Sequence, residues 1–350
     1  MNVLRFFHPV LPSRSLRGKP VKVTVADESF ALFRDEHGNA RALANRCPHR
    51  FAPLSAGRVD RGKLVCAYHG WSFDGEGHGE SASQPSLAKC DVRSMRVVEK
   101  HGYVWIANRD SEDEVPNFDF AASTPESGKA RFCGAFPVRF DAPLHVVLDN
   151  FSEDEHTPFV HTRLGWESRD VTSIGFHATR YDDRTEVHYD APQRPTRVGR
   201  IFGLHPGDVF HNDWVTRFDP PCTTYKTKWV DPKTSVTRPL RITSPIYFVP
   251  ETGSSTILHT FVFAETGEPY GRFFPLLRHI VTAIAFGEIW DDARFIPTVK
   301  HTPISMRGMR LGKFDKPLVH NRRLLDRLYF ANLDEVANAD DGTGTIQTGS

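Results

Sequence analysis

Two short segments of the chain each pair a cysteine with a histidine. Cys47 and His49 form the first pair, and Cys66 and His69 form the second, with sixteen residues between the pairs. Two thiolates and two imidazoles can hold a [2Fe-2S] cluster in which the cysteines bind one iron and the histidines bind the other. The same four ligands can also bind a single zinc ion. The residue types alone therefore leave both kinds of site open.

A second pair of histidines follows an acidic stretch. His156 and His161 are five residues apart, so on an undisturbed α-helix their side chains would point about 140° apart. Pro158 can break or kink such a helix and let both rings converge on one ion. Two histidines with a remote carboxylate form the facial triad that binds Fe(II) and leaves positions open for dioxygen. An acidic, solvated helix with incidental histidines is the alternative reading.

Candidates for the remote carboxylate lie in a helical pattern near the C-terminus. Glu288, Asp291 and Asp292 are all acidic, but adjacent residues on a helix point about 100° apart. Only one of Asp291 and Asp292 can therefore readily face an ion. A solvated acidic cluster on the protein surface is the alternative.

The cluster motif extends well beyond its four candidate ligands. The run CPHRFAPLS at 47–55, followed by LVCAYHGWSFDG at 64–75, closely resembles the Rieske domain of ring-hydroxylating and O-demethylating oxygenases. A motif of this length favours an iron-sulfur cluster over zinc. The resemblance implies that Cys47, His49, Cys66 and His69 are the cluster ligands.

The histidine segment is similar to a second signature of the same family, Asn-x-x-Asp-x-x-His-x₄-His. Asn150, His156 and His161 match this signature, whereas Glu153 stands where the family usually has aspartate. Among single-subunit, vanillate-demethylase-like members a C-terminal helix carries the ligand carboxylate, and this resemblance favours Asp292. The implied cofactors are a Rieske-type [2Fe-2S] cluster and a mononuclear Fe(II).

Glu153 has a role implied partly by position and partly by the resemblance. It precedes His156 by three residues, so on a helix it would share a face with that ligand and bind its outer nitrogen. In the family this carboxylate also meets a cluster histidine of a neighbouring chain, here His49 or His69. Glu153 would then bridge electron transfer between the two metal centres, and Asp154 is the alternative bridge.

The pattern of residues 21–108 predicts a small all-β unit. Apolar residues alternate or gather in four short runs: 21–25, 30–33, 64–65 and 103–106. A polar stretch at 110–129 reads as a linker. We therefore predict an N-terminal Rieske [2Fe-2S] domain over residues 1–115.

Strands and helices are segregated in the rest of the chain. The patterns predict a strand at 130–140, a helix at 144–161, a hairpin of 240–249 with 255–263, and helices near 270–295 and 316–331. This arrangement indicates an α+β domain over residues 116–338. The resemblance implies that it is a helix-grip catalytic domain with a central antiparallel sheet. Residues 339–350 are expected to form a disordered tail.

Charge and hydropathy exclude several other classes of protein. The chain has 44 Lys and Arg residues against 43 Asp and Glu residues, so it offers no electrostatic argument for binding nucleic acid or an anionic membrane. The N-terminus has no signal-peptide core, and the longest later apolar run, 280–286, is too short to cross a bilayer. We expect a soluble, cytoplasmic protein.

The resemblance implies a terminal oxygenase that hydroxylates or oxidatively demethylates a small aromatic or heteroaromatic compound with O₂. Electrons would come from NADH through a separate reductase or ferredoxin, because the chain has no Gly-x-Gly-x-x-Gly fingerprint between a strand and a helix. The resemblance also implies a homotrimer. Alternatives are a Rieske electron-transfer protein without oxygenase activity and a zinc-stabilised binding module. Aromatic residues that permit an apolar pocket, although most should belong to the core, are Phe202, Phe210, Trp214, Phe248, Phe261 and Phe263.

Overall fold

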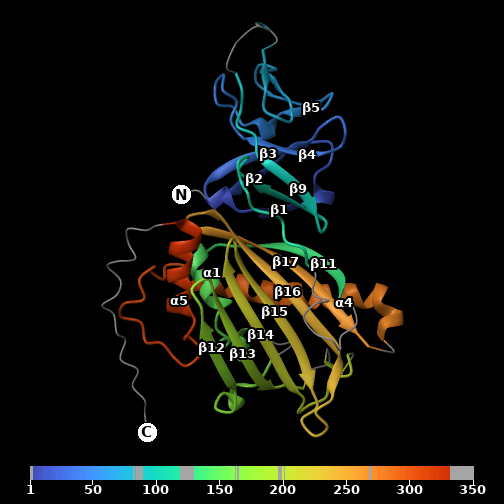
Figure 1. Cartoon of the computed structure of the whole chain (residues 1–350), viewed down its shortest axis with the longest axis vertical. Coiled ribbons are helices and arrows are strands. Elements are labelled where there is room, and N and C mark those ends of the chain that lie inside the picture. Colours follow the sequence, from blue (N-terminus) through green and yellow to red (C-terminus); the bar gives the residue numbers. More distant parts are fainter. Residues whose placement is uncertain are drawn as a thin grey trace.

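A computed structural model describes most of the chain in two parts, a small all-β part and a larger part built on one broad sheet (Figure 1). The described residues are 3–81, 83, 90–118, 130–161, 163, 165–195, 199–200, 202–267 and 270–331. The expected tail at 339–350 and much of the expected linker lie outside them. The boundary at residue 115 stays a prediction.

The N-terminal part consists of three small antiparallel sheets. Its strands are β1 (His8–Pro12), β2 (Val21–Val25), β3 (Glu28–Arg34), β4 (Ala40–Ala44), β5 (Arg58–Asp60), β6 (Lys63–Val65), β7 (Ser72–Phe73), β8 (Gly79–Glu80), β9 (Arg96–Lys100) and β10 (Tyr103–Ala107). The sheet orders are β1-β10-β9, β2-β3-β4 and β5-β6-β7-β8. Short 3₁₀ turns complete this part: η1 (Val3–Arg5), η2 (Ser13–Ser15) and η3 (Leu54–Ala56). The prediction of an all-β unit is confirmed.

The larger part is built on a seven-stranded antiparallel sheet with the order β11-β17-β16-β15-β14-β13-β12. Its strands are β11 (Arg131–Phe140), β12 (Gly175–Arg180), β13 (Arg184–Pro192), β14 (Val209–Phe218), β15 (Pro221–Val230), β16 (Thr237–Thr252) and β17 (Ser255–Thr266). The predicted hairpin of β16 and β17 is present, with Thr252 paired to Ser255 across its turn. The α+β fold with a central antiparallel sheet is confirmed.

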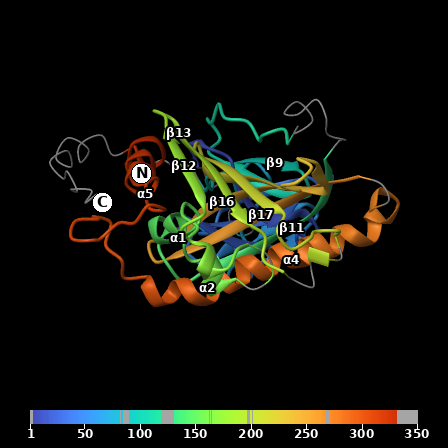
Figure 2. The same ribbon diagram turned by 90° about the horizontal axis from the view of Figure 1, so that it is seen from below.

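Helices cover one face of this sheet, and α4 runs along it (Figure 2). The helices and helical turns are α1 (Leu144–Asn150), α2 (Thr157–Val160), η5 (Ser168–Asp170), η6 (Tyr270–Phe273), α4 (Phe274–Phe295), η7 (Ile296–Val299), α5 (Leu318–Leu324) and the π-helical turn η8 (Leu325–Phe330). The helices expected near 270–295 and 316–331 are confirmed. Because α4 packs on β11 and β17, its inner face can place side chains above the sheet.

The single helix predicted for residues 144–161 was wrong. Helix α1 ends at Asn150, the chain turns, and α2 begins at Thr157 with Pro158 in its first turn. In a continuous helix the ring of Pro158 would clash with the carbonyl four residues earlier, at Asp154. In the first turn of a helix the missing N–H costs nothing. The proline therefore starts a new helix.

Helix α4 also has an exposed apolar side. The helical stretch Gly271–Val299 is long and apolar enough to cross a membrane by length and composition, and it is longer than the apolar run noted in the sequence. This is weak support for a membrane segment, since an apolar helix of a soluble protein passes the same test. Leu277, Val281 and Ile289 are buried, whereas Phe286 and Trp290 stack on each other in exposed positions.

Strand β10 connects the two parts of the structure, because one of its faces packs in the main core and the other packs on the large sheet. Val104 and Ile106 belong to the main core, while Tyr103 and Trp105 face the large sheet. The Trp105 ring stacks on Phe261 of β17, with 5.6 Å between ring centroids. The N-terminal part is thereby anchored on the sheet face opposite to α4.

A buried histidine lies at this junction. His8 is fully buried, and its Nε2 lies 2.9 Å from the Tyr329 hydroxyl while its Nδ1 lies 2.9 Å from the Phe6 carbonyl. Burial lowers the pKa of His8 to about 4. The unfolded chain therefore binds more protons than the folded chain between that value and the ordinary 6.5, and stability falls as pH falls through this window.

We predict that His8→Gln removes part of the acid sensitivity. One histidine with this shift should cost about 2 kcal/mol of unfolding free energy between roughly pH 7 and pH 5. The measurement is the unfolding free energy of both proteins at the two pH values. Equal pH dependence in wild type and variant would contradict this role of His8.

Candidate metal centres

The four cluster residues occupy two loops, one after β4 and one after β6. Cys47 and Cys66 are each 2% exposed, whereas His49 and His69 are exposed. The two imidazole rings lie close together, with 4.4 Å between centroids. The loops thus bury the thiol side of the site and present the imidazole side to the surface.

Backbone bonds shape both loops in the same way. The Cys47 carbonyl accepts the N–H of Phe51, and the Cys66 carbonyl accepts the N–H of Gly70. Phe51 and Gly70 both have positive φ, +61° and +71°. Glycine adopts that conformation at little cost. Each loop therefore reverses just after its histidine and holds cysteine and histidine on one side.

These four residues do not converge on one ion. Among the described residues, the groups of His, Cys, Asp or Glu whose donor atoms all lie within 4.8 Å of one another are found elsewhere. A zinc site needs all four donors about 2.0 to 2.3 Å from one ion. A two-iron cluster separates the cysteine ligands from the histidine ligands. The arrangement fits the cluster and argues against zinc.

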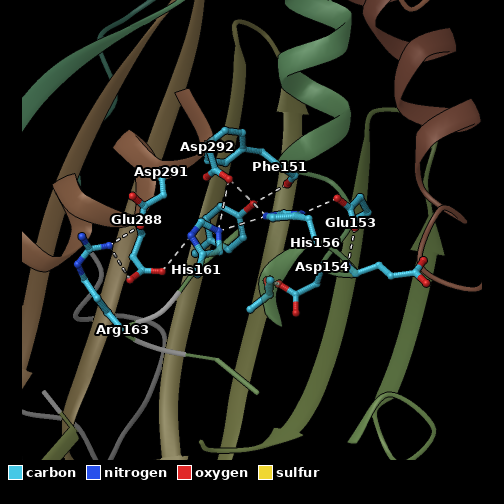
Figure 3. Close-up of polar contacts among 12 residues, drawn as sticks. Phe151, Glu153, Asp154, His156, His161, Arg163, Glu288, Asp291 and Asp292 are labelled. Carbon is cyan, nitrogen blue, oxygen red and sulfur yellow. Dashed lines mark hydrogen bonds and ion pairs between the residues drawn. The ribbon is translucent and has the colours of Figure 1, made fainter. Parts of the chain in front are cut away.

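His156, His161 and Asp292 do converge (Figure 3). The two Nε2 atoms lie 3.2 Å apart, and Oδ1 of Asp292 lies 3.5 Å from Nε2 of His156 and 3.4 Å from Nε2 of His161. These atoms form a nearly equilateral triangle whose centre is about 2 Å from each corner, close to a metal–ligand bond length. One divalent ion fits above the centre, with its other side open.

The electrostatics of the triangle also suit a cation. Burial raises the pKa of Asp292 to about 7, against the opposing effect of the His156 charge and the Asn150 amide. Burial also lowers the pKa of His161 to about 3. Oδ1 of Asp292 is buried without a hydrogen-bond partner among the described residues. Two imidazoles and a carboxylate of this kind would hold a non-haem Fe(II), whose chemistry is the binding and reduction of dioxygen.

Glu153 and Asp154 face different ways from the turn between α1 and α2. Oε1 of Glu153 lies 2.5 Å from Nδ1 of His156, so the expected contact exists although no continuous helix produces it. Burial would lower the pKa of His156, but the Glu153 charge and hydrogen bond raise it to about 9. Asp154 is buried and accepts bonds from Trp166 Nε1 and Thr157 Oγ1. Its carboxylate is therefore already engaged inside the domain.

The two other acidic residues of α4 have separate partners. Asp291 accepts a hydrogen bond from Arg163 at 2.5 Å and lies away from the triangle. Oε2 of Glu288 lies 3.2 Å from Nδ1 of His161, and burial raises the pKa of Glu288 to about 8. The sequence reading missed this contact with the ligand His161. Glu288 precedes Asp292 by four residues and shares its helix face, which is the signal that could have found it.

A cavity of about 190 Å³ opens beside the triangle. A cavity of 150 Å³ is enough to hold benzene, so a substituted ring would fit here. Its lining is mostly apolar and comes from β14 to β16, α4 and the loop before β14. Of the aromatic residues noted in the sequence, Phe202 and Phe210 line the cavity, whereas Trp214, Phe248, Phe261 and Phe263 are buried elsewhere in the core.

Comparison with known proteins agrees with this architecture. Residues 6–98 match the Rieske [2Fe-2S] domain family. The structure resembles dicamba monooxygenase bound to 3,6-dichlorosalicylic acid, with a TM-score of 0.75 and 21% identity over 94% of this chain and 98% of the other. It also resembles NdmA of Pseudomonas putida CBB5, with a TM-score of 0.67 and 20% identity over 94% and 92% of the two chains. The N-terminal part therefore contains a Rieske [2Fe-2S] domain, and the chain as a whole has the fold of dicamba monooxygenase.

Curated relatives match over part of their length. The oxygenase component of dicamba O-demethylase from Stenotrophomonas maltophilia is 36% identical over 154 residues, which are 42% of this chain and 44% of the relative. Protein TIC 55 of Pisum sativum is 30% identical over 173 residues, 47% of this chain and 31% of the relative. The chain thus spans less than half the length of these two relatives.

We predict that Asp292→Ala loses the mononuclear iron and Asp291→Ala keeps it, whereas Glu288→Ala keeps the site but binds iron more weakly, because it removes the carboxylate beside Nδ1 of His161. Only Asp292 supplies a corner of the triangle. Iron content of the three purified variants, with the cluster spectrum as an internal standard, decides the matter. Loss of iron from Asp291→Ala alone would overturn the choice of Asp292.

Proposed function

We propose that this protein is a terminal oxygenase that uses O₂ and reductase-supplied electrons to hydroxylate or oxidatively demethylate a small aromatic or heteroaromatic compound. The observation that carries the proposal is the triangle of His156, His161 and Asp292 at the edge of a ring-sized apolar cavity, in a chain that also has a Rieske domain. A pure electron carrier needs no such cavity.

The substrate class follows from the cavity and from the related proteins. The apolar lining favours a ring by burying its faces, and polar groups of the lining, such as Asn212 and Ser244, can orient a substituent. Structures of related proteins were solved with dicamba and with caffeine. We infer a substituted single-ring or fused-ring compound, oriented with its reacting group toward the triangle.

The residues around the triangle have distinct tasks in this proposal. His156, His161 and Asp292 would hold the iron, and Glu153 would orient His156 through its Nδ1. Asn150 lines the cavity beside this group. The apolar walls exclude water from the reacting face of the substrate.

Electron supply favours an assembly of several copies. The sheet of β5 to β8, next to the cluster loops, lies at the end of the N-terminal part that is remote from the large sheet (Figure 1). The cluster therefore does not face its own iron site. Exposed apolar side chains near the cluster include Phe51 and Tyr68, at 61% and 59%. Those on the helices of the iron site include Phe159 and Trp290, at 75% and 49%. These two patches would meet in a head-to-tail homotrimer.

A separate NADH-dependent reductase or a ferredoxin would reduce the cluster. We also propose that the protein is cytoplasmic.

The deciding experiment is turnover with an added reductase, O₂ and a panel of methoxy-, N-methyl- and unsubstituted aromatic compounds. The proposal expects oxygen-dependent formation of a hydroxylated or demethylated product. Cluster reduction and reoxidation without any product from the panel would favour an electron carrier.

Two histidine variants should separate the centres. We predict that His69→Ala loses the Rieske spectrum, because one iron loses an imidazole. His156→Ala should keep that spectrum and lose turnover, because only the mononuclear site loses a ligand. Electron paramagnetic resonance and product formation are the measurements. An unchanged Rieske signal in His69→Ala, or wild-type turnover in His156→Ala, would refute the corresponding assignment.

A further prediction concerns the bridge between copies. Glu153→Gln should retain both centres but slow electron transfer from cluster to iron severely, since an amide cannot accept charged hydrogen bonds from His156 and a neighbouring cluster histidine together. Single-turnover kinetics with substrate bound measure this rate. Asp154→Asn is the comparison, since Asp154 already bonds Trp166 and Thr157 inside the domain. A normal rate in Glu153→Gln with a slow one in Asp154→Asn would assign the bridge to Asp154.

A further inference from the structure

Four titratable side chains meet on the outer face of the large sheet, away from α4 and the cavity. His188 and Asp190 come from β13, and His211 and Asp213 come from β14. Asp190 pairs with His211 across the two strands, and the same register places His188 opposite Asp213. The backbone ladder thus holds all four side chains side by side.

Their outward direction follows from the alternation of the strands. Tyr189, between His188 and Asp190, is fully buried, and Asn212, between the other two residues, lines the cavity. Successive side chains on a strand point to opposite faces. The four residues therefore lie behind the cavity wall, outside the iron site.

The four side chains contact one another in a row, from Asp213 through His188 and Asp190 to His211. Nδ1 of His188 lies 2.5 Å from Oδ1 of Asp213, and its Nε2 lies 3.2 Å from Oδ2 of Asp190. Oδ1 of Asp190 also contacts Nδ1 of His211. Apart from this ion-pair contact with each other, both of these last atoms are shielded from solvent and have no hydrogen-bond partner among the described residues. One donor atom each from His188, Asp190 and His211 lies within 4.8 Å of the other two.

We propose that His188, Asp190 and His211 form a second metal site, for a divalent transition-metal ion of the zinc type. The carboxylate of Asp213 would hold the Nδ1–H of His188 and turn its Nε2 toward the ion, as carboxylates commonly do for metal-binding histidines. Donors of a tetrahedral zinc site are about 3.4 Å apart, given bonds near 2.1 Å. Small side-chain rotations bring the three donors to that spacing.

The neighbouring strand favours zinc-like ions over calcium or magnesium. Lys228 pairs with His211, and Lys226 pairs with Asp213, so both lysines share this face. Their positive charge opposes any divalent cation, so a bound ion must rely on strong bonds to its donors. Imidazole nitrogens bind zinc, copper or nickel through stronger bonds and do not bind calcium or magnesium well. The competing description is a network of histidine–aspartate ion pairs that binds no metal.

The test is a titration of the full-length protein, with both iron centres loaded, by Zn²⁺ alone. We expect one tightly held zinc per chain, with affinity reduced at least ~10-fold in His188→Ala and in His211→Ala, and roughly 10- to 100-fold in Asp213→Asn. The matched control is His177→Ala, because His177 is exposed and lies opposite His188 on β12 but outside the group. It should bind zinc as the wild type does.

A second readout distinguishes this site from the iron site. Zinc that binds only the folded protein raises the thermal unfolding midpoint, and this rise should persist in His156→Ala but vanish in the double variant His188→Ala/His211→Ala. Unchanged zinc uptake in the double variant would overturn the proposal. So would a rise that disappears in His156→Ala alone, because zinc would then be entering the mononuclear site.

Discussion

The iron site depends on how the irregular turn between α1 and α2 is held in place. Buried backbone polar groups need partners, and a turn cannot supply them from its own ladder. Two side chains from elsewhere provide them, since Tyr225 donates to the Phe151 carbonyl and Arg194 donates to the His161 carbonyl. A third side chain, Trp166, donates to the side-chain carboxylate of Asp154. These bonds fix both ends and the middle of the turn. The turn thus holds the imidazoles of His156 and His161 close together through contacts of the protein itself.

This bracing produces the convergence of His156 and His161 that the sequence predicted from a break at Pro158. A continuous helix would have spread His156 and His161 about 140° apart, whereas the turn places their Nε2 atoms 3.2 Å apart. Pro158 carried the necessary signal, since its ring forbids a continuous helix. The contact between Glu153 and His156 likewise survives without a shared helix face. What the sequence could not indicate is the bracing by Tyr225, Trp166 and Arg194, because those residues come from distant strands and loops.

The strands were more predictable than the site's supporting contacts for a physical reason. The alternation at 21–25 and the apolar run at 103–106 reflect which side chains of each strand are buried. That pattern can be read from the sequence of the strand alone. The contact of Glu288 with His161 joins residues from two segments 127 positions apart and depends on how α4 lies on the sheet. The four predicted cluster ligands could be picked from the sequence because they lie in two short, local segments. Asp292 could be preferred over Asp291 only through a family resemblance, since the two residues have the same chemistry and are adjacent.

The large sheet separates two kinds of chemistry on its two faces. On the inner face, Asn212 and Tyr225 line an apolar cavity whose substrate would have to be kept from water. On the outer face, β13 and β14 carry histidine and aspartate pairs that solvent can reach. Because alternate residues of one strand are tied to one backbone, an ion bound outside would stiffen the wall inside without touching the iron. Coupling between the outer ion and the inner cavity wall would require no moving element, because the paired strands are rigid.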